Sequence, residues 1–303
     1  MSGDDRSVHS SERVSAKYAA KRAATERIAA QRAAQARKER RRNIMVVGGS
    51  VLAVLAVVAA VIIVGVVTKS SHGAKANPVT PAAPSVLNAL QAAAQRTSTT
   101  PDFSTIAGPP AKLDGQPLTS GGKPEVLYVG AEYCPHCGNT RWPLAIALSR
   151  FGQFSNLKTT YSSNSDSPAH IPTLSFYQSS YSSPYLVFVG KEEEDGLGRP
   201  LEQLTSAENS LFQSVGGLAY PFIDFAGKWA QKGDALQPTL LSGMTVDQVA
   251  KALEDPSSKQ GKAILAAADI YTAIICEATG GQPTNVCSAP SVKAAEAALN
   301  GGK

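Results

Sequence analysis

Two closely spaced cysteines, Cys134 and Cys137, most constrain what this chain can fold into. Residues 125–130, just before them, are apolar and rich in β-branched side chains, which predicts a short buried strand. Residues 138–154, just after them, are rich in Leu, Ala, Ile and Arg and predict a helix. This order puts Cys134 at a helix N-terminus, where free backbone N–H groups and the helix dipole favour a negative charge. The charged form of cysteine is the thiolate, the nucleophile of thiol–disulfide exchange.

Cys137 follows one helical turn later, where it can close a disulfide or resolve a mixed one. A zinc half-site and a purely structural disulfide are the competing interpretations. Zinc needs two further ligands, and the other cysteines, Cys276 and Cys287, lie far downstream with ten residues between them. The strand–turn–helix context therefore favours a redox-active pair.

The segment that contains the pair, residues 131–137 with the sequence Ala-Glu-Tyr-Cys-Pro-His-Cys, resembles the active-site turn of the thioredoxin superfamily. Its Pro-His pair is similar to the one in DsbA-like oxidants. Residues 124–299 as a whole also resemble an uncharacterised prokaryotic family of membrane-anchored thioredoxin-like proteins, mainly through this turn, residues 220–225 and residues 276–287. The resemblance implies a thioredoxin-like fold and thiol–disulfide chemistry, but it implies no particular substrate.

Two residues beside the cysteines are candidates for tuning their chemistry. His136 lies between them, where an imidazolium or its N–H group can stabilise the Cys134 thiolate. In DsbA-like oxidants, the resemblance implies, this residue type makes the disulfide more oxidising. Glu132 is either a buried proton acceptor for the Cys137 thiol or a solvent-facing residue at the strand end, and the sequence favours neither.

The resemblance also implies a cis-proline beside the disulfide, just before a strand. Pro172 and Pro221 are both candidates, because a cis peptide bond is costly except before proline. We favour Pro221, since residues 222–225 follow it as a strand and residues 245–253 as a closing helix, which completes the fold.

Positive charge is concentrated in residues 1–43, which hold twelve Lys or Arg and five Asp or Glu. Residues 44–303 hold seventeen Lys or Arg and nineteen Asp or Glu. Because the excess of basic residues belongs to this tail, which we expect to be partly helical, a nucleic-acid partner is not expected.

Residues 44–68 contain no charged side chain and predict one transmembrane helix. The positive-inside rule then predicts a cytoplasmic tail and an extracytoplasmic remainder, which begins with a linker and arm at residues 69–123.

The stretch after the active-site helix predicts an insertion in the fold. Strands at residues 173–177 and 185–189 are expected to pair as a hairpin, followed by a helix at residues 201–215. The acidic run at residues 192–195 predicts a solvated loop.

A helical extension is expected at the C-terminal end of the domain, with helices at residues 259–278 and 291–299. Cys276 and Cys287 enclose a loop with Gly and Pro that can bring the two sulfurs within bonding distance, which predicts a structural disulfide. A second redox pair is the alternative.

The sequence as a whole predicts a single-pass membrane protein whose thioredoxin-like domain, at residues 124–300, exchanges disulfides with cell-envelope proteins. The expected partners are their thiols or disulfides, with a transmembrane redox partner as a further candidate, and no cofactor or metal is needed. The direction of exchange is not predicted. A tethered binding module with its cysteines locked as a disulfide is the main alternative, and copper or zinc handling through Cys134, Cys137 and His136 is a weaker one.

Overall fold

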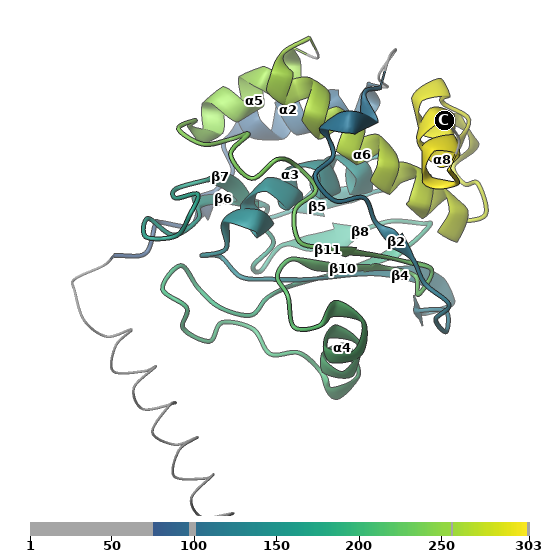
Figure 1. The fold of residues 1–303 in the computed structure, drawn as a ribbon, viewed down its shortest axis with the longest axis horizontal. Helices are drawn as coiled ribbons and strands as arrows, with labels where there is room; N and C mark the ends of the chain where they lie inside the picture. The colour runs from purple at the N-terminus through teal and green to yellow at the C-terminus, as the bar shows by residue number, and fades with distance from the viewer. Residues whose placement is uncertain (1–74, 97–100, 256, 302–303) are drawn as a thin grey trace, which may run out of the picture. The chain divides into compact units, whose positions relative to one another are not determined.

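The computed structural model describes residues 75–96, 101–255 and 257–301, which belong to one compact unit, Ala74–Lys303 (Figure 1). The predicted basic tail at residues 1–43 and the predicted transmembrane helix at residues 44–68 lie outside the described residues. Within the described ranges, no helix combines the length and the apolar character that crossing a membrane requires.

A mixed sheet of six strands forms the centre of the domain, in the order β2-β11-β10-β4-β3, with β9 also paired to β4. The strands are β2 (Ala111–Lys112), β3 (Thr119–Ser120), β4 (Lys123–Gly130), β9 (Val187–Glu192), β10 (Phe222–Phe225) and β11 (Trp229–Lys232). The pairing of β4 with β9 is parallel, whereas β10 is antiparallel to both β4 and β11. The predicted strand before the cysteines is confirmed as β4.

Helices cover the two faces of this sheet unequally, as Figure 1 shows. One face packs against the larger core cluster, and the helices on that side are α2 (Pro84–Gln95), α3 (Pro135–Ser149), α5 (Val246–Glu254) and α6 (Lys259–Ala278). Of the helices in the described ranges, only α4 (Ser206–Leu211) and the π-helical turn η2 (Phe212–Gly216) pack on the other face. Because side chains alternate along a strand, Tyr128 of β4 faces the larger cluster and Leu127 the smaller one.

Short strands between α3 and β9 differ from the predicted hairpin. The strands β5 (Gln153–Ser155), β6 (Lys158–Tyr161), β7 (Pro172–Ser175) and β8 (Ser180–Ser182) pair as β5 with β8 and β6 with β7, and β1 (Thr80–Pro81) adds to β6. The predicted pairing of residues 173–177 with 185–189 is therefore wrong. Residues 187–189 instead enter β9, which pairs in parallel with β4 at an edge of the sheet.

The helix that follows Cys134 ends at Ser149 and not at Phe154 as predicted. The reason is that residues 153–155 turn back to pair with β8. Gly152 permits the close approach, because a Cβ there would lie 2.3 Å from the carbonyl oxygen of Ser182. The predicted helix at residues 201–215 likewise begins only at Ser206, where Thr205 and Glu208 form a capping box.

The C-terminal helices are confirmed. Helix α6 has the predicted bounds, and α7 (Thr284–Cys287) and α8 (Pro290–Leu299) follow it. With them, the structure confirms an α/β domain that has a mixed sheet and C-terminal helices.

Part of the segment assigned to the linker and arm belongs to the core. Val86, Ala89, Leu90 and Ala93 of α2 are buried in the larger cluster, and α2 packs against α3 and α5. Downstream of α2 come the short helix η1 (Phe103–Thr105) and the strands β2 and β3. Residues 75–123 thus contribute to the same compact unit as the cysteines.

Candidate thiol site

Cys134 is the N-cap residue of α3, with Pro135 at the first helical position. Its sulfur accepts a hydrogen bond from the backbone N–H of Cys137 at 3.2 Å. Such N–H groups have no helical partner at the start of a helix, so the sulfur satisfies one of them. The sequence prediction that Cys134 lies at a helix N-terminus is confirmed.

The two sulfurs differ in exposure and in acidity. Both are free thiols, and Cys134 is 5% exposed whereas Cys137 is fully buried. A hydrogen bond from the Cys137 side chain lowers the pKa of Cys134, burial opposes this, and the Cys137 backbone N–H, Arg141 and His136 add to the lowering. Burial raises the pKa of Cys137 well above its usual value. Cys134 is therefore the more acidic and the more accessible thiol of the two.

The His136 side chain contacts the loop after β11. Its Nδ1 lies 2.5 Å from Oδ2 of Asp234, and the side chains of His136 and Asp234 are 42% and 12% exposed. Asn139 donates to Oδ1 of the same Asp234 at 3.4 Å. These contacts hold the ring in place, and the charge of His136 is one of the smaller causes that lower the pKa of Cys134.

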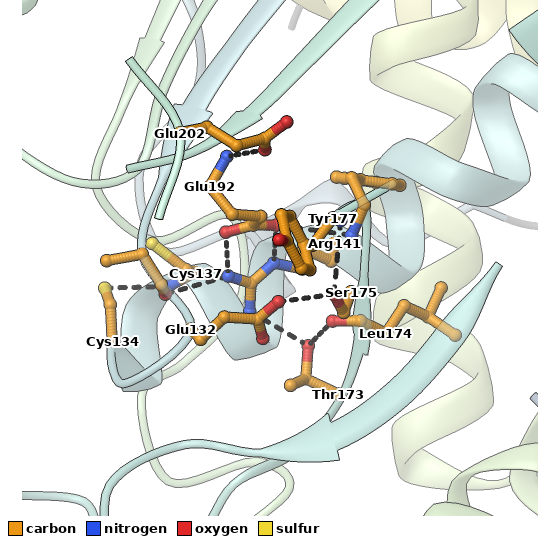
Figure 2. Close-up of polar contacts among 12 residues, drawn as sticks. Glu132, Cys134, Cys137, Arg141, Thr173, Leu174, Ser175, Tyr177, Glu192 and Glu202 are labelled. Carbon is orange, nitrogen blue, oxygen red and sulfur yellow. Dashed lines mark hydrogen bonds and ion pairs between the residues drawn. The ribbon is translucent and has the colours of Figure 1, made fainter. Parts of the chain in front are cut away.

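Behind Cys137 lies a buried ion pair that sequence reasoning missed. Arg141 donates from Nε and Nη2 to the two carboxylate oxygens of Glu192, at 2.8 and 2.6 Å, and neither side chain is exposed (Figure 2). A further Nη2 bond, 2.8 Å long, reaches the carbonyl oxygen of Ala131 just before the cysteine turn. The Arg141 charge favours the thiolates of both Cys134 and Cys137.

Glu132 joins this cluster as a buried carboxyl group, which excludes the predicted alternative of a solvent-facing residue. It is 1% exposed, Ser175 donates a hydrogen bond to Oε1, and Oε2 has no hydrogen-bond partner among the described residues (Figure 2). Burial raises the pKa of Glu132, and the Arg141 guanidinium and the Ser175 bond oppose the rise. Burial also raises the pKa of Glu192, against its two bonds from Arg141. The Arg141 guanidinium thus favours the charged forms of two buried carboxyl groups, those of Glu132 and Glu192.

The acidic run at residues 192–195 begins inside β9 and none of its residues is exposed, so its prediction as a solvated loop is wrong. Beyond Glu192, the Glu193 carboxylate accepts a 2.7 Å bond from the Tyr220 hydroxyl, and burial together with the Glu194 charge raises the pKa of Tyr133. Tyr133 and Tyr220 pack against the cysteines. A local charge pattern cannot show such partners, because they come from distant parts of the chain.

The two candidate prolines occupy different places. The Tyr220–Pro221 bond is cis, which agrees with the choice of Pro221. The Tyr220 side chain packs against the cysteines. The Ile171–Pro172 bond is not among the cis bonds of the described residues, which precede Pro168, Pro221 and Pro283. Pro172 begins β7, and its carbonyl oxygen accepts a 2.9 Å bond from the Trp142 indole.

A disulfide joins Cys276, in the last turn of α6, to Cys287 of α7, as predicted. It ties the two helices together at the C-terminal end of α6. Over the described ranges, no three His, Cys, Asp or Glu side chains are grouped so that they could hold a metal ion.

Comparison with known proteins places the chain in a family without assigning a function. No curated protein and no solved structure matches it. A family model described as a domain of unknown function, DUF929, matches residues 109–277, a stretch that includes β4, the thiol site and Cys276. Because this match covers more than half of the 303 residues, the chain belongs to the DUF929 family.

Proposed function

We propose that this protein is a thiol–disulfide oxidoreductase in which Cys134 exchanges disulfides with partner proteins and Cys137 resolves the intermediate. The observation that carries the proposal is the contrast between the two sulfurs. Cys134 caps α3 with a lowered pKa, and Cys137 is buried behind it with a raised pKa. A structural disulfide needs no such contrast.

The arrangement around the pair supports a thioredoxin-like domain. A strand leads into the cysteine turn, a parallel strand lies on one side of it, and an antiparallel hairpin lies on the other. That hairpin follows the cis bond before Pro221. These features are those that the resemblance of the cysteine turn implies.

Exchange in the reducing direction takes two steps. The Cys134 thiolate attacks one sulfur of a partner disulfide, so that a mixed disulfide forms and the second partner sulfur leaves as a thiolate. Cys137 then loses its proton and attacks the Cys134 sulfur, which forms the Cys134–Cys137 bond and releases the first partner sulfur. Two electrons pass from the cysteine pair to the partner, and oxidation of a dithiol reverses both steps.

The buried cluster supplies the groups for the second step. Arg141 favours the Cys137 thiolate, and its guanidinium also acts on Glu132. The raised pKa of Glu132 and its unpartnered Oε2 suit a group that accepts and returns a proton. We assign the Cys137 proton to Glu132 on this basis.

A trapping experiment tests the proposal. In the full chain in its own membrane, Cys137→Ser keeps the attacking sulfur and removes the resolving one, so mixed disulfides with envelope proteins should accumulate and vanish on reduction. Replacing Pro221, whose neighbour Tyr220 packs against the pair, should also prolong such adducts. The matched control is Cys134→Ala combined with Cys137→Ser, which should form none.

Two outcomes decide between the candidate functions. If folded, exported Cys137→Ser forms no adducts, exchange is ruled out and the tethered binding module takes its place. If adducts form, the reduction potential of the pair sets the direction. A value near roughly −270 mV, as in thioredoxin, indicates a reductase, and one near roughly −120 mV, as in DsbA, an oxidase.

We further propose an extracytoplasmic site of action, with residues 44–68 as the anchor. The uncharged stretch and the basic tail support this topology, and the structural disulfide between Cys276 and Cys287 suits an oxidising compartment.

A further inference from the structure

A cavity of about 700 Å³ lies beside α4, on the opposite face of the central sheet from the larger core cluster. Its apolar walls include Leu127 of β4, Leu211 of α4 and Val215 of η2. The segment at residues 113–119 closes another side. This segment approaches the turn before β11 so closely that a Cβ at Gly227 would lie 2.0 Å from the carbonyl oxygen of Gln116. The volume is within the range of small-molecule sites.

Carboxyl groups from four separate segments line this apolar cavity: Asp114, Glu125, Glu208 and Asp224. Asp224 is fully buried, and its Oδ1 accepts a 2.6 Å bond from the backbone N–H of Gly227. Its Oδ2 is also buried but has no hydrogen-bond partner among the described residues. A buried carboxylate oxygen without a partner is costly, so a hydrogen-bond donor that reached Asp224 from the cavity would be stabilised there.

The electrostatics of the cavity favour a positive charge. Burial raises the pKa of Asp224 to about 6, and the neighbouring Glu125 adds to the rise. Burial likewise raises the pKa of Glu125, to which the charge of Glu208 adds. Among the ion pairs of the described residues, only that of Lys191 with Glu208, at 4.0 Å, offsets these charges.

The spacing of the carboxyl groups indicates the kind of cation. No three acidic, His or Cys side chains in the described ranges are close enough together to hold a metal ion. An organic cation is larger and brings apolar surface that Leu127 and Leu211 can cover. We infer that this cavity binds a small organic cation, with an ammonium or guanidinium group at Asp224 and Glu125 and an apolar body against the leucines. The site is separate from the thiol pair and does not depend on the proposed exchange.

Methyl NMR of the full chain in lipid nanodiscs tests the inference, with cyclohexylammonium as the cationic probe and cyclohexanol as its uncharged counterpart. The ammonium should shift the methyl signals of Leu127, Leu211 and Val215 in a saturable way. The alcohol should bind about tenfold more weakly, because a hydrogen bond to a charged group is the difference between them. A blocked Ala-Lys-Ala peptide tests the source of the cation: tighter binding assigns it to a peptide side chain, and weaker binding to a free amine.

Variants then identify the carboxyl group. Asp224→Asn keeps the bond to Gly227 but removes the charge, and it should weaken ammonium binding about tenfold. Glu254→Gln removes an exposed carboxylate from α5 and should change nothing. Cys134→Ala should also leave binding unchanged, which separates this site from the thiol chemistry. The inference is overturned if the ammonium causes no saturable shifts, if the alcohol binds equally well, or if Asp224→Asn binds like the unmodified chain.

Discussion

The guanidinium of Arg141 lies 2.6 Å from the carboxylate of Glu192, and neither side chain reaches solvent. Arg141 comes one helical turn after Cys137, on the helix that Cys134 caps, whereas Glu192 ends the parallel strand beside β4. The ion pair therefore links α3 to β9. The Arg141 charge also lowers the pKa of both thiols.

Removing one member of this pair should be far more damaging than removing both. Arg141→Met leaves the Glu192 carboxylate buried without its partner and should lower the free energy of unfolding by about 3–5 kcal/mol. Arg141→Met combined with Glu192→Leu should recover most of this loss. Urea denaturation measures the free energy of unfolding of both variants. The control is Arg199→Met at the exposed Arg199–Asp195 pair, where the expected loss is about 0–1 kcal/mol. An Arg141→Met loss no larger than that of the control contradicts the structural role.

The acidity of Cys134 should depend on the side chain at position 137. The hydrogen bond from Cys137 is the largest cause of the lowered Cys134 pKa, so Cys137→Ala should raise that pKa. Cys137→Ser keeps a donor and should raise it less. Thiolate absorbance at increasing pH, with alkylation rates as a second measure, reports the change. Equal titration curves for the Ala and Ser variants would show that the bond does not matter.

Asp224 should make the stability of the domain fall as the pH rises. Burial raises its pKa from 3.8 to about 6, so the folded state holds the proton more tightly than the unfolded state does. The stabilisation is complete below pH 3.8, and it is lost as the pH rises through about 6, a change of up to about 3 kcal/mol. Asp224→Asn should make this slope shallower, because Glu132, Glu192 and Glu125, whose pKa values are also raised, still contribute to it. The variant should be more stable than the unmodified chain at pH 7. Thermal unfolding between the two pH values, with Glu254→Gln as the control, measures it; an unchanged slope contradicts the assignment.

The disulfide between Cys276 and Cys287 should behave as a structural bridge. It closes a loop with a sequence separation of 11, so replacing both cysteines with Ser should lower the free energy of unfolding by about 3 kcal/mol in the chain-entropy model. It should also stay intact when Cys134 and Cys137 are selectively reduced. Mass spectrometry of alkylated peptides detects the bonded pairs. A Cys134–Cys276 linkage, or reduction of both pairs at one potential, would instead indicate an electron shuttle.

Topology is tested with a protease added to spheroplasts. The proposed orientation exposes the domain that contains Cys134, so the domain should be lost at the rate of a known external protein, and the tail at residues 1–43 should be protected. Survival of the domain while the external control is cut would reverse the topology.

The features predicted from sequence are those with a local cause. The cysteine turn, its strand and the bounds of α6 follow from residues that lie next to one another, and so does the short-range disulfide. Arg141, the partner of Glu192, is 51 positions away in the chain. The residues next to Glu192 therefore give no sign that this glutamate is buried and not exposed to solvent. The place of Arg141 beside Cys137 could have been predicted from the sequence, since a spacing of four residues puts both on one face of a helix.

Strand pairing was missed for the same reason. The apolar residues at 185–189 predict a strand equally well in a hairpin and in the sheet, and only the whole fold selects β4 as the neighbour. The core position of α2 depends on α3 and α5, which lie far downstream in the chain.

The burial of α2 decides which fragment of the chain can fold. Because the compact unit begins at Ala74 and not at residue 124, a fragment cut at residue 124 would lose α2. The surfaces of α3 and α5 that α2 covers would then be open to solvent. An exposed apolar face of this kind promotes aggregation, so a soluble fragment that contains the thiol pair has to keep the chain from Ala74 onward.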